Sequence, residues 1–492
     1  MPEIGLKKSE FALSSLAIGA DTIIAIAGVI CAALLIAGTQ YIYCFIISAK
    51  SGRMRWVKSV KLPNYCGYLS KTSNNLAAEL YVHAKGPFYV SVRHATQNDA
   101  PEWRSPNFPC HAQSACFDVW GGLDWSDPVT IPLSNLRDGA HIVDIIPQDE
   151  AAQMYRIPML VRHEWRSVIV VSSTNTWSAY NKFGGISNYY CGAIPLPLRP
   201  LFFILQSTGR CFRLSDRIVI PTVPLPKRRP LHNINDELRA LQSDREIGAS
   251  HLYRGELCLL RSLDKLGIPY SVASDEDVEN FDINKSSTKI VFFNTHSEYW
   301  SDLGISALNN LISRGTSVAF LSGNNIYRRV QRTESGLQVI DQMVNIDETA
   351  RLIGAGYDAL GYQTFAGYRV IEPDHWLFSN CSELQSNGYF GRGDGTSAHP
   401  GGSGHETDKI RPSSEGFQLL AMGENAEGGA SMVCKDLPGG GFVFNASSVS
   451  FTAMLEADAS LPQLIENMVE RALGQPKSLE PQLSETSFEV AS

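Results

Sequence analysis

The sequence predicts an α/β protein in which an antiparallel β-sandwich precedes a mainly parallel sheet, with one transmembrane helix ahead of both. Three patterns predict this architecture: a long apolar run near the N-terminus, period-two alternation over residues 62–163, and strands that alternate with helices from Ser167 onward. Strands joined by helices form right-handed crossovers, so the later strands are expected to run parallel in one sheet.

The composition is that of a globular protein with a mildly acidic balance. The 492 residues are 44% apolar and 19% charged, and the net charge is −8. Proteins that bind nucleic acid usually carry a basic surface, so this balance argues against a nucleic-acid partner. Ten cysteines in 492 residues is ordinary usage, which argues against a disulfide scaffold. They include no Cys-x-x-Cys pair, which argues against a zinc ribbon or a thioredoxin-type motif. The composition indicates no oligomeric state.

Residues 22–49 are predicted to form a transmembrane anchor behind an N-terminal tail, residues 1–21. The stretch from Thr22 to Thr39 is apolar and free of charge, and a second apolar stretch follows Gln40. About 20 apolar residues cross a bilayer core of about 30 Å. The run exceeds the apolar core of a signal peptide, and no small-residue cleavage motif follows it. We therefore expect a single-pass membrane protein that contacts the lipid bilayer through residues 22–49.

The charges that flank this segment predict its orientation. Five Lys or Arg residues lie in the basic linker, residues 50–61, whereas only Lys7 and Lys8 precede the span. The positive-inside bias places the C-terminal part of the chain in the cytoplasm. Glycosylation acceptors would suit the opposite side, but such triplets arise easily by chance; they begin at Asn284, Asn380 and Asn445.

Residues 62–163 are predicted to form a small antiparallel β-sandwich. Apolar and polar residues alternate over 79–84 and again over 88–92, and the sequence Lys85-Gly86-Pro87 separates the two runs. Period-two alternation interrupted by a Gly-Pro turn is typical of a β-hairpin. Further turn signals recur up to about residue 162, as in a sandwich of short strands.

Residues 164–474 are predicted to form the α/β domain. Its first strand is a continuous apolar run at 167–172, as expected for a strand covered on both faces. Later strands are expected at 269–272, 289–294, 317–322 and 441–445, and helices at 252–266, 302–314 and 461–473. Ser301 is a candidate N-cap for the second of these helices. The tail, residues 475–492, is polar and is predicted to be disordered.

Polar and aromatic residues follow three strands of the predicted sheet, where each strand ends. Ligands of open α/β sheets bind beyond the carboxyl ends of the strands, so these residues are candidates for one site. They are Asn175, Trp177 and Tyr180 after the first strand, His296, Glu298 and Trp300 after the second, and Asn324 and Tyr327 after the third.

Each candidate has a structural alternative. Glu298, beside His296, could act as a general base or a metal ligand, or it could be a carboxylate favoured by a helix N-terminus. Trp177 and Trp300 could be substrate platforms or parts of the core. Glu406, in the acidic cluster 404–408, could shape the pocket or order a loop.

Four motifs in a single order resemble a known family. They are Asn175-Thr-Trp-Ser-Ala-Tyr-Asn-Lys-Phe-Gly-Gly185, His296-Ser-Glu-Tyr-Trp300, Gly404-His-Glu-Thr-Asp408 and Gly440-Gly-Phe-Val-Phe-Asn445. Residues 62–473 resemble the C-terminal domain of the N,N-dimethylformamidase large (beta) subunit and its relatives. The resemblance implies a glutamine-amidotransferase-like α/β fold that lacks the cysteine of those enzymes.

The resemblance also implies a cofactor. In the formamidase, an iron held by two tyrosines and a glutamate activates water for amide hydrolysis. Tyr180 resembles the first tyrosine and Glu298 the glutamate, so these two residues are the implied metal ligands. The second tyrosine falls near residues 229–233, where this sequence carries Leu231.

Two functions follow as hypotheses. The first is a membrane-anchored, formamidase-like amide hydrolase in which a metal at Tyr180 and Glu298 would activate water and polarise the carbonyl. His296 is the expected proton shuttle and Asn324 the expected oxyanion donor. The alternative is a non-catalytic, membrane-tethered module that binds a small molecule, a sugar or a peptide. Both hypotheses use the same residues for substrate or ligand contacts: Asn175, Trp177, Tyr180, Trp300, Tyr327 and Glu406.

Overall fold

The structure is a computed structural model, and it describes part of the chain. The described residues are 57–71, 76–97, 100–185, 187–188, 223–240, 251–280, 287–343, 345–381, 384, 388–394 and 399–474. The predicted anchor at 22–49 and the predicted tail at 475–492 lie outside these ranges. Within them, no helix has both the length and the apolar character needed to cross a bilayer. The anchor therefore stays a prediction.

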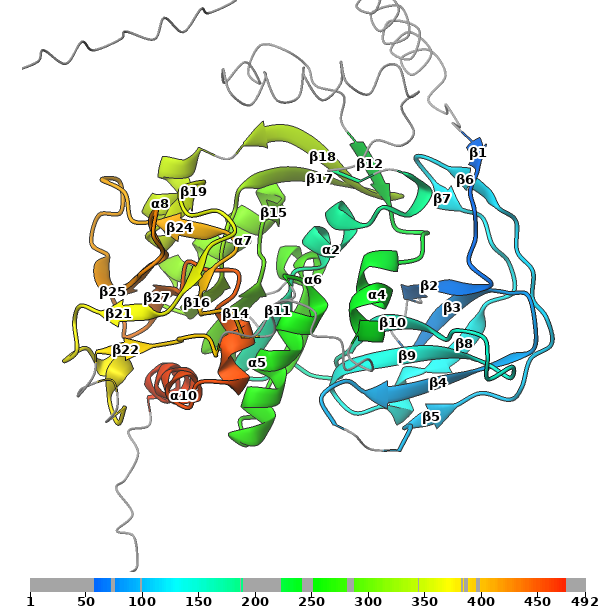
Figure 1. Ribbon diagram of the computed structural model, residues 1–492, viewed down its shortest axis with the longest axis horizontal. Helices are drawn as coiled ribbons and strands as arrows, with labels where there is room; N and C mark the ends of the chain where they lie inside the picture. The colour runs from blue at the N-terminus through cyan, green and yellow to red at the C-terminus, as the bar shows by residue number, and fades with distance from the viewer. Residues whose placement is uncertain are drawn as a thin grey trace, which may run out of the picture. The chain divides into compact units, whose positions relative to one another are not determined.

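Two antiparallel sheets form a β-sandwich in the N-terminal part of the described chain (blue to cyan in Figure 1). One sheet has the order β2-β3-β8, with β2 at Tyr65–Lys71, β3 at Ala77–Ala84 and β8 at Val129–Pro132. The other has the order β10-β9-β4-β5, with β10 at Tyr155–Val161, β9 at Gly139–Pro147, β4 at Phe88–His94 and β5 at Trp103–Arg104. A third small sheet joins β1 (Val57–Ser59), β6 (Cys116–Asp118) and β7 (Gly122–Leu123).

The predicted hairpin at 79–92 is wrong, although both of its strands exist. β3 pairs with β2 and β8, whereas β4 pairs with β9 and β5, so the two strands belong to opposite sheets. Their apolar residues, such as Leu80 and Val90, lie in one buried core. Period-two alternation fixes which face of a strand is buried, but not which strand it pairs with.

A nine-stranded sheet forms the centre of the following part of the chain. Its order is β13-β11-β14-β16-β27-β26-β25-β21-β22. The pairs from β13 to β27 are parallel, and the pairs from β27 to β22 are antiparallel. The parallel half contains β13 (Ser271–Ser274), β11 (Val168–Ser172), β14 (Ile290–Thr295), β16 (Ser317–Ser322) and β27 (Phe442–Asn445). The antiparallel half contains β26 (Ser431–Asp436), β25 (Gln418–Gly423), β21 (Tyr368–Val370) and β22 (Tyr389–Phe390). The mixed α/β class is thus confirmed, while the mainly parallel sheet is corrected to a half-parallel one.

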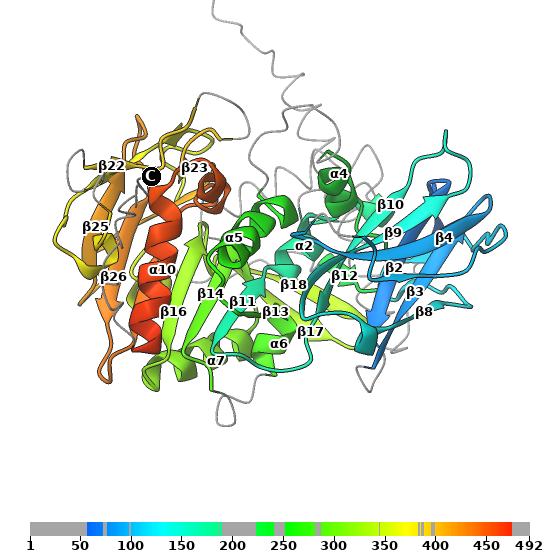
Figure 2. The same cartoon turned by 90° about the horizontal axis from the view of Figure 1, so that it is seen from below.

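Helices cover both faces of this sheet, and β11 shows how its sequence allows this. Val168 and Val170 lie in the core beneath α5 (Tyr253–Lys265) and α10 (Ser460–Leu473), two helices that Figure 2 shows on the same face. Ile169 and Val171 lie in the core beneath the helices of the other face. Those helices are α6 (Asp275–Glu279), α7 (Asp302–Ser313) and α8 (Ile346–Ile353). A strand buried on both faces needs a continuous apolar run, as the sequence predicted.

Smaller elements surround the ends of the parallel strands. A second sheet has the order β12-β18-β17-β15, and two ribbons pair β19 with β24 and β20 with β23. The strands are β12 (Val223–Pro226), β15 (Tyr299–Trp300), β17 (Arg328–Thr333), β18 (Gly336–Met343), β19 (Gly356–Asp358), β20 (Phe365–Ala366), β23 (Ser403–Gly404) and β24 (Thr407–Lys409). The remaining helices are α2 (Thr174–Tyr180), α4 (His232–Ala240), η1 (Leu133–Asn135), η2 (Phe183–Gly185), η5 (Trp376–Phe378) and η6 (Thr452–Glu456).

Hydrogen bonds join the sandwich to α4. The Tyr155 hydroxyl of β10 lies 2.9 Å from His232 Nδ1, and the backbone N–H of Arg156 donates to Asn235 Oδ1 at 3.0 Å. The buried Arg156 guanidinium also donates to the carbonyl oxygen of Leu238 at 2.7 Å. Its charge is balanced by Asp144, 3.1 Å away on β9. These contacts fix α4 against the edge strand of one sandwich sheet.

Candidate functional site

Tyr180 and Glu298 meet at the carboxyl edge of the parallel strands. Tyr180 is the last residue of α2, which follows β11, and Glu298 lies three residues beyond the end of β14. The Tyr180 hydroxyl donates a hydrogen bond to Glu298 Oε2 at 3.0 Å. Glu298 is fully buried, whereas Tyr180 is only partly buried. The pair therefore places a buried carboxylate behind a phenol that reaches toward the surface.

His296 and Glu406 extend this pair into a chain of charged groups. His296 Nε2 lies 3.4 Å from Glu298 Oε2 and 3.1 Å from Glu406 Oε2. Asn324, in the turn after β16, donates from Nδ2 to the same oxygen of Glu406 at 2.9 Å. Tyr180, Glu298, His296, Glu406 and Asn324 thus form one continuous network, which we call the Tyr180–Asn324 chain.

The electrostatics of this chain favour an ion pair between His296 and Glu406. Burial alone would lower the pKa of His296, but the contact with Glu406 and the charges of Glu298 and Asp408 outweigh it and raise the pKa. Burial would raise the pKa of Glu406, but its contact with His296 and the amide of Asn324 lower it to about 2. The two neighbouring carboxylates therefore favour the protonated form of the His296 imidazole.

The backbone around the chain is strained. Eight non-glycine residues of the described chain have positive φ, and five of them are at this edge: Thr295, Asn324, Ile326, His405 and Ser447. They follow β14, β16, β23 and β27. Left-handed backbone costs a non-glycine residue of order 1–3 kcal/mol and is concentrated at functional sites, where the surrounding structure holds it. The concentration at this edge supports a functional site.

A buried polar layer holds the strained turns in place. Asn325 Nδ2 donates to Asp408 Oδ2 at 2.7 Å, and the backbone N–H of Asp408 donates to the carbonyl oxygen of Ser447 at 2.9 Å. Burial raises the pKa of Asp408 to about 6, although its hydrogen bonds from Asn325 oppose the rise. Asp408 thereby links the turn that carries Asn324 to the strand that follows Glu406.

Aromatic side chains that are partly buried or exposed lie around the Tyr180–Asn324 chain, and we call them the aromatic rim. The His251 ring lies 5.2 Å from that of Tyr180 and is stacked at 5.1 Å on that of His405. The Tyr362 ring lies 6.1 Å from that of His405. Tyr327 and Tyr357 pack edge to face at 4.9 Å, and the charge of Glu406 contributes to the raised pKa of Tyr357, after burial. Aromatic rings above buried polar groups are typical of a small-molecule site.

The structure brings together only some of the residues that the sequence proposed. Tyr180, His296, Glu298, Asn324 and Glu406 form the chain, and the backbone N–H of Tyr327 donates to the carbonyl oxygen of Glu298 at 3.0 Å. The Asn324 side-chain amide donates to the Glu406 carboxylate in this structure. The sequence analysis expected this amide to donate to a substrate oxyanion instead. The rim residues His251, Tyr357 and Tyr362 were not proposed, because they come from segments without a motif.

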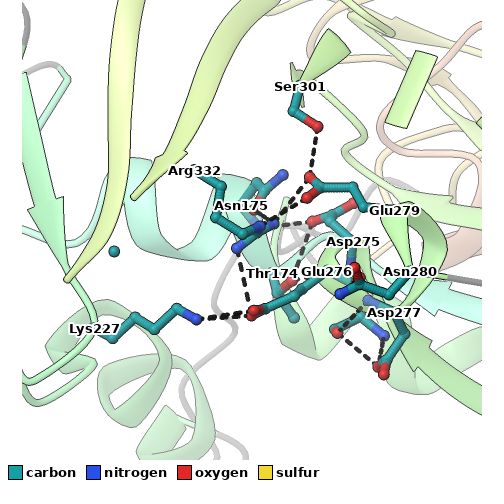
Figure 3. A network of polar contacts seen from close by, with 12 residues as sticks. Thr174, Asn175, Lys227, Asp275, Glu276, Asp277, Glu279, Asn280, Ser301 and Arg332 are labelled. Atoms are coloured by element: carbon teal, nitrogen blue, oxygen red, sulfur yellow. Dashed lines mark hydrogen bonds and ion pairs between the residues drawn. The ribbon is translucent and has the colours of Figure 1, made fainter. Parts of the chain in front are cut away.

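Asn175 belongs to a different network. Its side chain donates to the carbonyl oxygen of Tyr299 at 3.1 Å and accepts from Arg332 at 3.3 Å. Figure 3 shows it among the acidic residues of α6. Arg332 binds Glu279 through two nitrogens, at 2.8 and 3.0 Å. This network attaches the start of α2 to α6, and it does not contact the Tyr180–Asn324 chain through Asn175.

The two tryptophans are core residues. Trp177 is buried, and its Nε1 donates to Glu256 Oε1 at 2.8 Å. Trp300 is buried against Phe293 and donates from Nε1 to the carbonyl oxygen of Ser297 at 2.9 Å. Both indoles are buried in this structure, which is the structural alternative given above, and their use as substrate platforms stays an untested prediction.

The family now follows from comparison with known proteins. Residues 82–349 and 342–463 match the family described as "N,N-dimethylformamidase beta subunit-like, C-terminal". The chain belongs to this family. The match includes every member of the Tyr180–Asn324 chain, so the site described above lies within the part of the protein that defines the family.

The other comparisons give no further support for a family or a fold. No curated protein matches the chain. A ThuA-like protein from Parabacteroides merdae is 10% identical, with a TM-score of 0.28, over 48% of this chain and 91% of that one. A β-D-glucuronidase from Dictyoglomus thermophilum is 8% identical, with a TM-score of 0.13, over 53% of this chain and 44% of that one. Neither score is high enough to infer a shared fold.

The residues present do not fit the iron site that the family resemblance implies. The segment expected to carry the second tyrosine does lie beside α2, because Asn181 Nδ2 donates to the Pro230 carbonyl oxygen at 2.9 Å and Asn233 Nδ2 to that of Trp177 at 3.0 Å. The residue there is Leu231, which packs against the apolar core. Among the described residues, no group of three His, Cys, Asp or Glu side chains is placed to hold a metal.

Proposed function

We propose that the protein is an amide hydrolase that cleaves the C–N bond of a small amide at the Tyr180–Asn324 chain. The observation that carries the proposal is the buried triad of Glu298, His296 and Glu406, with contacts of 3.4 and 3.1 Å. General acid–base catalysis needs one group that accepts a proton and another that donates one at the same site, and carboxylates beside an imidazole can fill both roles. Membership of the formamidase-like family supports a small amide as the substrate.

Residues of the Tyr180–Asn324 chain can supply each proton transfer. Glu298 accepts a proton from water as the water oxygen attacks the amide carbonyl carbon. The Tyr180 hydroxyl, which donates to Glu298 in the resting structure, then turns to donate to the carbonyl oxygen. His296, protonated beside Glu406, then gives its proton to the leaving nitrogen as the C–N bond breaks. Glu298 returns the captured proton to His296. The products are a carboxylic acid and an amine, so atoms and protons balance.

The surrounding architecture extends the proposal. The parallel half of the sheet, with helices on both faces, supports a glutamine-amidotransferase-like arrangement in a domain at 164–474, behind a sandwich domain at 62–163. The charge-free run at 22–49 supports a single-pass anchor with the catalytic part in the cytoplasm. The aromatic rim supports a small, largely apolar substrate.

The test is hydrolysis by the full-length protein purified in detergent. N,N-dimethylformamide is the first substrate, and formate and dimethylamine are measured together by proton NMR. We expect equal amounts of both products from the wild type and none above background from Glu298→Gln. Saturable binding of the amide without release of either product would instead favour the non-catalytic binding module.

A further inference from the structure

An open cavity of 490 Å³ lies outside the Tyr180–Asn324 chain. It is bounded by α8, β19 and the segment that follows β24. The side chains used in the argument are Asp347, Arg351, Asp358, Lys409, Arg411 and Ser413. Its volume is within the usual range of small-molecule sites.

The charges that line this cavity leave an excess of cations. Three of the lining side chains are cationic and two are anionic. Arg411 is held by both carboxylates, with Nε 3.3 Å from Asp347 Oδ1 and Nη1 3.9 Å from Asp358 Oδ2. Arg351 has no ion pair among the residues that the structure describes. The guanidinium of Arg351 and the ammonium of Lys409 are therefore the groups that a ligand could neutralise.

Lys409 adds a second argument for an anion. Its ammonium group contacts the Thr407 hydroxyl and is partly buried. Burial lowers the pKa of Lys409, although the charges of Asp408 and Asp358 oppose this effect. An anion in the cavity would replace the water that this ammonium has lost, and guanidinium groups bind phosphate or carboxylate oxygens in a favourable planar geometry.

We propose that this cavity binds an organic oxyanion, a phosphate or a carboxylate, through Arg351, Lys409 and Arg411. The hydroxyl of Ser413 donates to Asp347 at 3.1 Å and helps to fix the carboxylate that orients Arg411. The Arg411 guanidinium is thus held in place before a ligand arrives, which lowers the entropic cost of binding.

The position of the cavity connects it to the candidate active site. On β19, Tyr357 is paired with Asp408 of β24. The charge of Glu406 acts on Tyr357, and Asp408 accepts hydrogen bonds from the turn that carries Asn324. The next residues, Asp358 and Lys409, line the cavity. Because successive side chains of a strand point to opposite faces, the β19–β24 ribbon separates the two sites by a single layer of backbone.

The experiment measures binding and needs no turnover, so it can fail or succeed independently of the proposed hydrolysis. The full-length protein in detergent is titrated with inorganic phosphate, and separately with acetate, by calorimetry at constant ionic strength kept with sodium chloride. Arg351→Gln removes the unpaired cation. Arg314→Gln is the matched control, because Arg314 is exposed at the end of α7 and is not part of the cavity.

We expect saturable binding of at least one probe, weakened about ten-fold or more in Arg351→Gln and unchanged in Arg314→Gln. Saturation by phosphate alone indicates a phosphorylated ligand, and saturation by acetate alone indicates a carboxylate. Lys409→Gln provides a second variant, and the circular dichroism spectrum confirms that each variant is folded. If neither probe saturates the wild type, or if both Arg variants bind as the wild type does, the proposal is overturned.

Discussion

The phenolic hydroxyl of Tyr180 lies 3.0 Å from a carboxylate oxygen of Glu298, although 118 positions separate the two residues in the chain. The contact exists because β11 and β14 are parallel neighbours, with Val170 beside Phe292 in the register. Parallel neighbours end at one edge, so the segments that follow them meet there. The same relationship brings Asn324 to this edge from β16, the next strand of the sheet.

Tyr180→Phe should reduce amide hydrolysis by about ten-fold, because it removes a hydrogen-bond donor. Glu298→Gln should reduce it by about 100-fold or more, because it removes the general base. Formate release under saturating substrate checks both. Tyr81→Phe is the matched control, since the Tyr81 hydroxyl donates to Glu79 Oε2, also at 3.0 Å, in the sandwich. Full activity in Glu298→Gln would contradict the assignment of the base.

Glu406→Gln should destabilise the protein most between about pH 4.5 and 6.5. The pKa of His296 is raised above 6.5, so its contribution is complete below 6.5 and is lost as the pH rises through the folded-state pKa. The pKa of Glu406 is lowered from 4.5 to about 2, so its contribution is complete above 4.5 and is lost as the pH falls through 2.

Urea unfolding of the wild type and Glu406→Gln at several pH values measures this difference. Breaking a buried ion pair typically costs about 3–5 kcal/mol, which sets the expected maximum. A difference that stays constant from pH 4 to 9 would show that the two groups are not an ion pair in the folded protein.

The free energy of unfolding of Glu256→Gln should increase relative to that of the wild type as the pH rises. Burial raises the pKa of Glu256 from 4.5 to about 8, although hydrogen bonds from Ser172, Trp177 and Ser173 oppose the rise. The stabilising contribution of the proton is therefore complete below pH 4.5, declines above it and is lost as the pH passes 8. The Gln side chain does not titrate, so the variant lacks this decline.

The measurement is the free energy of unfolding at pH 5 and pH 8.5. The gap between Glu256→Gln and the wild type should change by more than 1 kcal/mol in favour of the variant, since one pKa unit corresponds to about 1.4 kcal/mol. The exposed Glu348→Gln, on α8, is the control and should follow the wild type at both pH values. Parallel behaviour of all three proteins would exclude a buried neutral Glu256.

Leu231→Tyr should increase iron retention if Tyr180 and Glu298 are two parts of a three-ligand site. The new phenol would come from a segment that already lies against α2. Each protein is loaded with ferrous iron, passed over a chelating resin and analysed for metal. Leu231→Phe has the bulk without the hydroxyl and should retain no more iron than the wild type. Stoichiometric iron in the wild type after this treatment would show that Leu231 does not mark a missing ligand.

Deletion of residues 1–49 should release the protein from membranes. The full-length chain is expected in the membrane pellet after carbonate washing, because the apolar run at 22–49 is long enough to span a bilayer. The truncated chain should remain in the supernatant and keep the circular dichroism spectrum of a folded α/β protein. Recovery of the full-length chain in the supernatant would contradict the anchor.

The buried elements of the sheet could be predicted from sequence because their signals are local. The strands at 168–172, 290–295 and 317–322 each contain four consecutive apolar residues. Ser301 caps α7 by accepting from the backbone N–H of Gly304. The antiparallel half could not be predicted, because its pairing depends on segments far apart in the chain, such as β21 and β25. Pairing between distant segments has no local sequence signature.

The site was predictable in part for a similar reason. The ends of parallel strands converge at one edge of the sheet. This rule predicted that four residues would lie close together: Tyr180, His296, Glu298 and Asn324. Asn175 lies five residues before Tyr180 on the same helix. At 3.6 residues per turn, its side chain points about 140° away from that of Tyr180 around the helix axis. It therefore meets Arg332 in another network. His251 could not be found, since a single histidine next to no motif gives no signal.

The location of β27 has a consequence for synthesis on the ribosome. This strand is the last of the central sheet in sequence, yet it lies beside β16 in the interior, and the strained Ser447 lies two residues beyond its end. A nascent chain that stops before β27 lacks both an interior strand and the partner that holds Asp408. Domains fold as units, so the edge that carries Tyr180 and Glu298 cannot form until β27 has emerged. Truncated translation products would thus expose the apolar flank of β16 and be targets for chaperones or proteases.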